Sequence, residues 1–554
     1  MNREVLDGYT FANMLRSGAA SLRTNKEEVN SLNVFPIPDG DTGDNMFMTI
    51  ESGVTEVCSG DEMSIEEVAS RAARGMLLGA RGNSGVILSR IFAGVNRGLK
   101  GCDKININDF AEALKCGVEE SYKAVSVPVE GTILTVYRDA VRYASGKITD
   151  KSTFEDYFDD ILEETRNSLE RTPDLLPVLK EAGVVDSGGA GILYIVEGMR
   201  DFLKGDISAD TDNEPESDSG TTKKNIDLSL FGEETDLIYG YCTEFLLRVQ
   251  SKRNDKEFFD MDELIDYLNY VGDSVVCFRD GSIVKVHVHT KRPGDVFNHC
   301  QKYGEFLTVK VENMTLQHHG NVSKQSSELK NKVRKKYGIV TVAAGKGVKE
   351  LFSSLGCDTV VDGGQSMNPS AEDFIKAFEE INADNIFVFP NNSNIILTAK
   401  QAAMLYEASN IIVIPTKTIG EGYASISMID YNYENPTKIE KELTEVAEGV
   451  KTGMISKANR ASSKDGINIK NGDYIGFCDD KVLIDDPTRS SAVMELAKIL
   501  NAGDWDVVLL IAGDEADADE ANMLKENLQE SFPSTEVILI DGKQPVYDYM
   551  LVLM

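Results

Sequence analysis

Residues 33–46, NVFPIPDGDTGDNM, form a glycine-rich, polar interruption between helical segments, and they decide how the first part of this 554-residue chain is interpreted. Asp39 and Asp41 stand one residue apart. On a helix such side chains diverge by about 200°, but in a turn relaxed by Gly40 and Gly43 both carboxylates can converge on an oxygen-seeking cation. Mg²⁺ is usually held by one or two carboxylates together with phosphate oxygens. The stretch therefore predicts a magnesium and phosphate site.

The alternative for this turn is a solvent-exposed Asp-Gly sequence without a ligand. Against it, Pro36 and Pro38 stiffen the approach, and three further phosphate-type loops occur in the same domain, at 82–85 (GNSG), 131–136 (GTILTV) and 186–191 (DSGGAG). The free amides at such helix starts can face an anion, although an ordinary helix start explains each loop equally well. No Walker A motif occurs, so a nucleotide site here is not a P-loop.

The segments around these loops indicate a mainly helical domain. Residues 64–78, SIEEVASRAARGMLL, carry apolar side chains at helical spacing, and Ser64 with Glu67 is expected to form a capping box. Asn83 or Ser84 is expected to cap the helix that follows GNSG. We therefore predict helices separated by loops that have a function of their own.

The charge balance limits the partners that the chain can have. Lysine and arginine number 57 against 91 aspartate and glutamate, so the net charge is 57 − 91 = −34. Nucleic acid is not expected as a partner, because neutralising its phosphates requires a basic surface. We find no signal peptide and no stretch of about 18 apolar residues, so we expect no transmembrane segment and a cytoplasmic protein. Eight cysteines without a CxxC pair do not indicate a disulfide framework.

The clearest change in composition lies at DISADTDNEPESDSGTT, which has six acidic and no basic residues and is expected to be a flexible linker. We accordingly expect a multidomain protein of α and α/β parts. The predicted parts are a helical domain at 1–205, the linker at 206–224, an α+β domain at 225–328 and an α/β domain at 329–554.

The two later domains differ in the order of their predicted strands and helices. YGYCTEFLLRVQ, DSVVCFRDGSIVKVHVHT and FLTVKVENM alternate as strands do, around one helical run. From KKYGIVTVAAG onward, apolar strands alternate with helices, as in a parallel sheet. Polar loops at 362–370 (DGGQSMNPS) and 389–394 (FPNNSN) fall at the carboxyl ends of predicted strands, where such sheets bind ligands, unless they simply make turns. A hairpin-like stretch at 465–478 and a last strand–helix–strand unit follow.

The five histidines all lie within 33 residues, from His287 to His319, so the first domain has none. If that domain transfers phosphate, its base must be a carboxylate or its acceptor must already be an anion. His287 and His289 share one face of a predicted strand, and Cys242 can supply a thiolate from a neighbouring strand, which gives a three-ligand Zn²⁺ site. The alternative is an exposed strand face with two ordinary histidines and a buried cysteine. We favour a structural or regulatory metal.

The ordered motifs NVFPIPDGDTGDNM, GARGNSGVILS, VEGTILTV and AGVVDSGGAG closely resemble the ATP-binding domain shared with the L subunit of dihydroxyacetone kinases. With YGYCTEF, VKVHVHT and a DegV-like DGGQSMNPS region following, nearly the whole chain resembles the ATP-binding subunit of bacterial fatty acid kinase. The resemblance implies an all-helical barrel that binds ATP and two Mg²⁺, a small zinc-type middle domain and a DegV-like α/β domain. It also implies a separate fatty-acid-binding carrier protein, whose bound carboxylate becomes an acyl phosphate.

The resemblance further implies roles for individual residues. Asp39 and Asp41 would bind the metals, with Asp44 or Asn33 as further contacts. Thr42 is the implied catalytic neighbour, but it stands where dihydroxyacetone kinases have a histidine, so the role of that histidine does not transfer. The implied nucleotide contacts are Asn45, Met46, Gly82, Asn83, Ser84, Gly131, Thr132, Asp186 and Gly188. The implied zinc ligands are Cys242, His287 and His289.

The chemistry of a fatty acid fits these implications. A carboxylic acid with a pKa near 4 to 5 is already ionised at neutral pH, so it needs no histidine to activate it. Its difficulty is repulsion from ATP, which two Mg²⁺ ions reduce, and Arg81 or Arg74 is a candidate for further positive charge. Two other functions stay open: a non-catalytic nucleotide- or lipid-sensing scaffold, and a dihydroxyacetone-type kinase, which the two extra domains disfavour. We also expect a homodimer.

Overall fold

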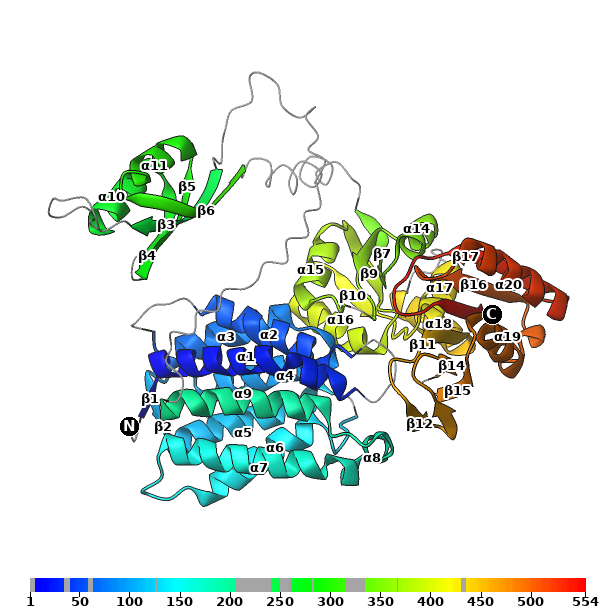
Figure 1. Ribbon diagram of the computed structural model, residues 1–554, viewed down its shortest axis with the longest axis horizontal. Helices are drawn as coiled ribbons and strands as arrows, with labels where there is room; N and C mark the ends of the chain where they lie inside the picture. The colour runs from blue at the N-terminus through cyan, green and yellow to red at the C-terminus, as the bar shows by residue number, and fades with distance from the viewer. Residues whose placement is uncertain are drawn as a thin grey trace. The chain divides into compact units, whose positions relative to one another are not determined.

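The computed structural model describes residues 5–33, 40–57, 63–125, 127–205, 241–249, 259, 261–280, 283–313, 334–365, 367–429, 435–479 and 481–554. The chain forms two compact units, one made of Met1–Asn213 with Arg334–Met554 and the other of Glu214–Val333. The larger unit contains a helical lobe and an α/β lobe (Figure 1). The predicted linker at 206–224 lies outside the described residues, and the domain boundaries stay predictions.

The helical lobe packs its helices around one apolar core (Figure 1). Its helices are α1 (Gly8–Ser31), α2 (Thr42–Glu56), α3 (Ile65–Gly79), α4 (Gly82–Gly98), α5 (Ile107–Ala124), α6 (Ile133–Lys147), α7 (Phe154–Leu175), α8 (Pro177–Ala182) and α9 (Ser187–Lys204). A short antiparallel ribbon joins β1 (Val5–Asp7) to β2 (Lys104–Asn106). The predicted helical amino-terminal domain is confirmed. No described helix combines the length and the apolar character needed to cross a bilayer.

Side-chain caps fix where several of these helices begin. Ser64 and Glu67 form the predicted capping box of α3, and Thr153 with Asp156 forms a second one at α7. Each box satisfies amide groups that the first helical turn leaves without backbone partners. Caps of this kind stop a helix from beginning one turn earlier or later, and they therefore set where the intervening loops lie.

The α/β lobe begins with a parallel sheet, as its rhythm predicts. The strand order is β10-β9-β7-β8. The strands are β7 (Lys335–Ala343), β8 (Thr359–Asp362), β9 (Ala383–Phe389) and β10 (Asn410–Val413), and the helices are α14 (Lys346–Ser354), α15 (Ala371–Glu379), α16 (Ser393–Leu405) and α17 (Ile419–Ser427). Phe387 and Phe389 enter one core cluster and Val388 enters another, so β9 is buried on both faces.

A second, mixed sheet completes this lobe, in the order β15-β14-β11-β18-β16-β17. Its elements are α18 (Pro436–Gly449), β11 (Lys451–Lys457), β14 (Tyr474–Cys478), β15 (Lys481–Asp486), α19 (Arg489–Ile499), η2 (Ala502–Asp504), β16 (Val507–Ala512), α20 (Ala518–Ser531), β17 (Glu536–Asp541) and β18 (Tyr549–Leu553). The last predicted strand–helix–strand unit is present, since β16 and β17 pair in parallel.

The predicted hairpin at 465–478 is wrong. Within it, β13 (Ile467–Ile469) pairs antiparallel with β12 (Ser462–Lys464), the strand that precedes it in the chain, while β14 pairs with β11 and β15. Asp465 and Gly466 have φ of +52° and +82°, the left-handed values that a two-residue hairpin turn requires. The tight turn therefore precedes the stretch instead of lying inside it.

The described residues of the smaller unit form an antiparallel sheet with two helices, so the predicted α+β middle domain is confirmed. Its elements are β3 (Tyr241–Val249), α10 (Met261–Val271), β4 (Asp273–Asp280), β5 (Ile283–Thr290), α11 (Pro293–Cys300) and β6 (Gly304–Asn313), with the strand order β4-β5-β3-β6. Leu264 and Leu268 on α10 pack with Val284, Val286 and Val288 of β5 in its core.

Candidate active site

The helical lobe brings several of its glycine-rich helix starts together. Ser187, the first residue of α9, donates its hydroxyl to Thr42 Oγ1 at the start of α2, over 3.3 Å. A Cβ added to Gly188 would lie 3.0 Å from the Cβ of Ile133, the first residue of α6. The starts of α2, α6 and α9 are therefore neighbours. Each helix N-terminus carries unpaired amides and about half a positive charge, which favours an anion.

The start of α4 joins this group through Gly82, its first residue. The φ of Gly82 is +57°, and a Cβ there would lie 2.6 Å from Asn45 Nδ2 and 3.1 Å from Asn368 Nδ2. Asn45 lies near the start of α2, so α2 and α4 begin side by side. Both the left-handed backbone and the lack of room require glycine at this position. Four helix N-termini thus meet in one region, an arrangement that suits a polyphosphate.

The prediction that Asn83 or Ser84 caps α4 is wrong. The N-cap residue is Arg81, which makes no side-chain cap, and the helix begins at Gly82. The Arg81 guanidinium instead donates to the backbone oxygen of Asn368 over 2.7 Å. The first-turn amides of α4 are therefore not covered by a capping side chain from residue 81.

Asp41 is the N-cap residue of α2 and lies within this region. Its Oδ2 accepts a hydrogen bond from Asn368 Nδ2 over 2.6 Å, and its carboxylate is also hydrogen-bonded by Asn45. Burial raises the pKa of Asp41 to about 6; the charge of Asp44 adds to this effect, while the two asparagine amides oppose it. A partly buried carboxylate whose ionised form is disfavoured in this way gains from a bound cation.

Asp44 is engaged by α1. Its Oδ1 lies 2.8 Å from Lys26 Nζ, and its Oδ2 accepts a hydrogen bond from Asn30 over 2.7 Å. Asn30 Oδ1 in turn accepts the amide of Gly43 over 2.7 Å. These bonds fasten the first turn of α2 to α1, and a metal would have to compete with them. A metal role for Asp44 therefore stays a prediction.

Three other predicted residues have different surroundings. Asn33 accepts a hydrogen bond from Arg460 of the α/β lobe through its backbone oxygen. Met46 is fully buried and packs where a Cβ on Gly191 would collide with it, so its side chain belongs to the core of the lobe. Asp39 lies outside the described residues. The metal roles of Asn33 and Asp39 stay predictions.

Asp186 fixes the start of α9 from the N-cap position. Its Oδ2 accepts the amide of Gly189 over 2.7 Å, and its own amide donates to Thr172 Oγ1 over 3.1 Å. Burial raises the pKa of Asp186 to about 6, against the effect of hydrogen bonds from the amides of Gly189 and Ile133. Asp186 thus orders the loop between α8 and α9, and it brings to the site a second carboxylate whose ionised form is disfavoured by burial.

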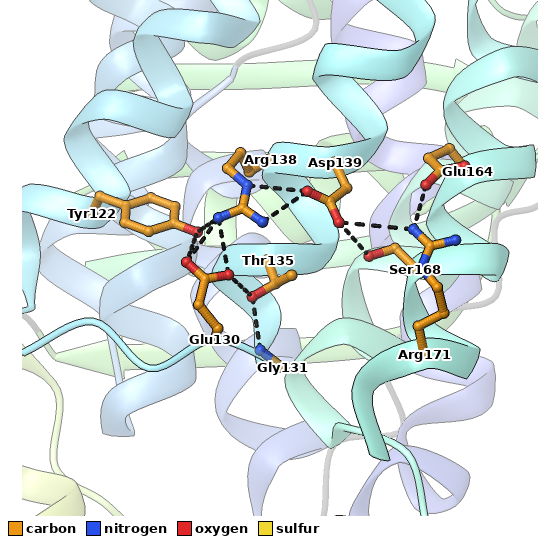
Figure 2. Close-up of polar contacts among 9 residues, drawn as sticks. All are labelled: Tyr122, Glu130, Gly131, Thr135, Arg138, Asp139, Glu164, Ser168 and Arg171. Carbon is orange, nitrogen blue, oxygen red and sulfur yellow. Dashed lines mark hydrogen bonds and ion pairs between the residues drawn. The ribbon is translucent and has the colours of Figure 1, made fainter. Parts of the chain in front are cut away.

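A polar network holds the loop before α6, which contains Gly131 (Figure 2). The Gly131 amide donates to Thr135 Oγ1 over 2.8 Å, and that hydroxyl donates to Glu130 Oε2 over 2.7 Å. Arg138 Nη1 reaches Glu130 Oε1 at 2.7 Å and the hydroxyl of Tyr122 at 2.8 Å. Burial disfavours the Glu130 carboxylate, but the hydrogen bonds from Thr135 and Arg138 outweigh it and lower the pKa of Glu130.

The network continues into α7 and ties three helices together (Figure 2). Arg138 also donates to Asp139 Oδ1 over 2.9 Å, and Asp139 Oδ2 accepts the hydroxyl of Ser168 over 3.2 Å. Arg171 lies 3.8 Å from Asp139 Oδ2. Thr132, the N-cap residue of α6, donates its hydroxyl to the backbone of Val129 over 2.8 Å. The predicted Gly131–Thr132 loop is therefore anchored by this network, and the start of α6 that follows it lies beside the start of α9.

The two polar loops of the α/β lobe lie at the carboxyl ends of β8 and β9. A cavity of about 390 Å³ there is lined by Gly363 and Gly364 after β8 and by Asn391 and Asn392 after β9. Asn33 of the helical lobe also lines it. Both loops therefore serve one cavity, at the place where open α/β sheets bind ligands.

Three family models match the chain in order. They are the DAK2 domain at residues 36–201, the FakA-like middle domain of fatty acid kinase at 238–321 and the FakA-like C-terminal domain of fatty acid kinase at 338–553. Protein YloV of Bacillus subtilis is 39% identical over 556 residues that cover 100% of both chains. The chain belongs to the FakA-like family of fatty acid kinase proteins. A kinase family is thereby established, and the resemblance stated from the motifs is confirmed.

Two further similarities accompany this assignment to the FakA-like family. An uncharacterized protein of Staphylococcus epidermidis is 40% identical over 98% of each chain. Among solved structures, DegV of Bacillus subtilis, described as a fatty acid binding protein, matches 40% of this chain and 99% of its own at 14% identity, with a TM-score of 0.32.

The residues present fit the ATP and magnesium that a kinase of this family implies. Four helix starts and the close approach at Gly82 form a cradle for phosphates. The Oδ1 atoms of Asn83 and Asn368 are buried and accept no hydrogen bond from the described residues. Among these residues, no three His, Cys, Asp or Glu side chains gather as a preformed metal site. Asp41 is the described carboxylate best placed to hold a cation together with phosphate oxygens.

The middle domain of this kinase-family chain places the backbone of the predicted zinc ligands in register. Cys242 of β3 stands opposite His289 of β5, and Glu244 stands opposite His287. The side chains of these four residues lie outside the described part of the chain. A zinc site at this place stays a prediction.

One residue of the site escaped the sequence analysis. Asn368 bonds Asp41 although the two are 327 residues apart, and nothing local to either motif indicates the contact. The available signal was the polar loop DGGQSMNPS, which we expected to bind a ligand of the α/β lobe. Its asparagine instead reaches the helical lobe of the kinase.

Proposed function

We propose that the chain is the ATP-binding subunit of a fatty acid kinase, which transfers the terminal phosphoryl group of ATP to a fatty acid carboxylate and releases acyl phosphate and ADP. The observation that carries this proposal is the meeting of four helix N-termini around Asp41. Amides and helix ends of this kind bind phosphates, and a partly buried carboxylate among them gains from a bound cation.

The chain's own residues bind and orient the reactants in this proposal. The starts of α2, α4, α6 and α9 would hold the phosphates, and Asp41 with Asp39 would hold Mg²⁺, which when bound supplies charge neutralisation at the transferred phosphoryl group. Thr42 and Ser187, whose hydroxyls are in contact, are the first residues of α2 and α9. Asp186 and the Glu130–Arg138 pair would keep two of the loops in place.

The reaction proceeds without a proton-transferring base. A carboxylate oxygen attacks the terminal phosphorus, the bond from that phosphorus to the bridging oxygen breaks, and the electron pair leaves with ADP. The summed charge is the same on both sides, so no proton is taken up or released. This fits a helical lobe in which no histidine occurs between residues 1 and 205.

A carrier protein and a zinc ion complete the proposal. A free fatty acid buries its chain in micelles or membranes, so a separate fatty-acid-binding protein is the physically sensible donor of the carboxylate. Zinc bound by Cys242, His287 and His289 would stabilise the small middle domain. The second magnesium ion, the homodimer and the cytoplasmic location stay predictions.

The decisive experiment compares Asp41→Ala with the wild-type chain. The assay supplies ATP, Mg²⁺ and a DegV-family fatty-acid-binding protein loaded with oleate, and it measures ADP release together with acyl phosphate trapped by hydroxylamine. We expect the wild type to consume ATP only when loaded carrier is present, and we expect Asp41→Ala to abolish both products.

Asp103→Ala is the matched control, because Asp103 is an exposed acid of the same lobe and its loss changes the net charge equally. This control should keep wild-type turnover. Normal turnover by Asp41→Ala would refute the assignment, and ATP binding without any turnover by the wild type would favour a sensing scaffold.

A further inference from the structure

The two lobes of the larger unit meet beside Asp41 through paired backbone. Arg81 and Ser370 form an antiparallel bridge, and the amide of Ala371 donates to the carbonyl of Ala80 over 3.3 Å. Backbone pairing imposes a register, so the α/β lobe is seated in one position against the start of α4.

Asn368 stands at one end of this contact and reaches the carboxylate of Asp41. It is 1% exposed, and its Nδ2 donates to Asp41 Oδ2 over 2.6 Å. Its backbone oxygen accepts Arg81 Nη1 over 2.7 Å, and the other end of that guanidinium lies 3.8 Å from Asp373. Because main chain and side chain are both held, the amide cannot turn away while the lobes stay docked.

The same contact buries two amide oxygens that accept no hydrogen bond from the described residues, Asn368 Oδ1 and Asn83 Oδ1. Asn83 also crosses between the lobes, because its Nδ2 donates to Asn394 Oδ1 over 3.2 Å. Buried acceptors of this kind are rare, because they forgo a hydrogen bond to water. A bound ligand, ion or water that approaches them would remove this cost.

The hydrogen bond from the Asn368 amide to Asp41 is of a kind that supports metal binding by Asp41 and does not block it. A segment that blocked the site in place of magnesium would be expected to neutralise Asp41 with a lysine or arginine. The amide of Asn368 instead orients the carboxylate and leaves its negative charge to a cation. Arg81, a cation of this contact, is directed to Asn368 and Asp373.

We propose that Asn368 is a positioning residue of the phosphoryl-transfer site, supplied in cis by the α/β lobe, which holds Asp41 in the orientation that binds the metal–nucleotide complex. The site is then complete only while the two lobes are docked. This inference rests on the proposed function for the role of Asp41, and it adds that the carboxy-terminal lobe takes part in nucleotide binding by the helical lobe.

The test uses the full chain and Asn368→Ala. Gln401→Ala is the matched control, because Gln401 is a buried amide of the same interface that donates to the carbonyl of Leu77 over 2.6 Å and does not contact Asp41. Calorimetry measures the affinity for AMP-PNP with Mg²⁺, and a kinase assay measures turnover. Hydrogen bonds to charged groups typically contribute a factor of about 10 to 100, so we expect Asn368→Ala to weaken binding at least about tenfold. Gln401→Ala should stay within about twofold of wild type.

Asn368→Gln separates positioning from packing. It keeps an amide donor but adds volume, so it should recover part of the lost affinity if the donor matters, and it should do no better than alanine if only packing matters. Unchanged binding by Asn368→Ala, tighter binding, faster turnover or a failure of glutamine to improve on alanine would each overturn the proposal.

The binding arm needs neither fatty acid nor carrier. If the wild type binds AMP-PNP and Asn368→Ala weakens that binding, while no fatty acid is ever phosphorylated, the proposed function fails and this inference stands. If the wild type turns over and Asn368→Ala binds and turns over normally, only this inference fails.

Discussion

Gly82→Ala tests whether the start of α4 forms part of the nucleotide cradle. Two costs follow from the structure. At φ of +57° an alanine adopts a left-handed backbone, which costs about 1–2 kcal/mol. Its Cβ would also lie 2.6 Å from Asn45 Nδ2, and Asn45 is 5% exposed, so that amide has no free space to move into. Overpacking of this kind typically costs about 1–3 kcal/mol more.

Gly101→Ala is a matched control for the backbone cost alone. Gly101 has φ of +83°, and a Cβ added there meets nothing within 4 Å. It lies in the turn after α4, at the opposite end of a 17-residue helix, which puts it about 25 Å from Gly82 at 1.5 Å per residue. The control therefore also places an alanine at a positive φ in the same lobe, but without touching the site.

The assay combines thermal unfolding with calorimetric titration of AMP-PNP and Mg²⁺. Both variants should unfold at lower temperature than wild type, and Gly82→Ala should be the less stable by about 1–3 kcal/mol. We expect about tenfold weaker nucleotide binding for Gly82→Ala, because the displaced Asn45 amide no longer supports Asp41, and wild-type binding for Gly101→Ala. Equal nucleotide affinity in the two variants would show that the cradle does not include the start of α4.

Two further predictions concern pH and zinc. Asp186→Asn keeps an oxygen that can cap Gly189, and it removes a carboxyl whose folded pKa of about 6 exceeds its usual value of 3.8. Wild-type protein loses stability as pH rises from about 4 to about 6, because this carboxyl is then ionised in the unfolded state but still protonated in the folded state. The variant should therefore be more stable than wild type at pH 7.5, by up to about 3 kcal/mol, and equal to it at pH 4. Unfolding measured without nucleotide across this pH range tests the sign, and a gain in stability that does not depend on pH would contradict it. Elemental analysis of the full chain should find about one zinc, absent in His287→Ala and retained in His299→Ala; no zinc in wild type would remove the site.

The local sequence was sufficient to predict those elements that are determined by residues close to one another in the chain. The capping box of Ser64 and Glu67 and the parallel strands from residue 335 follow from side chains within a few positions of each other. The polar loops after β8 and β9 were placed correctly at one edge of the sheet for the same reason, because strand direction alone determines where their ends meet.

The sequence did not predict features that depend on backbone geometry or on contacts between residues far apart in the chain. Arg81 occupies the N-cap position of α4 without making a side-chain cap, although asparagine and serine are the better cap formers by chemistry, because α4 already begins at Gly82. β18 fills the centre of the second sheet between β11 and β16, a place that depends on pairing with strands far back in the chain. Asn368 illustrates the extreme case, since its role exists only once two lobes are docked.

The charge of the chain bears on how the site can work. With a formal charge of −34 the protein as a whole repels ATP and fatty acid carboxylates. Under the proposed function, attraction must therefore be local, from helix N-termini that act within about one turn and from a cation that Asp41 would hold. The helix N-termini do not suffice without the cation, because they lie beside the Asp41 carboxylate, whose negative charge repels phosphate and whose pKa is raised to about 6 by burial. A site built in this way binds its nucleotide only together with the metal, so nucleotide affinity should depend steeply on Mg²⁺ concentration, and binding of free ATP as tight as that of its magnesium complex would contradict the proposed role of Asp41.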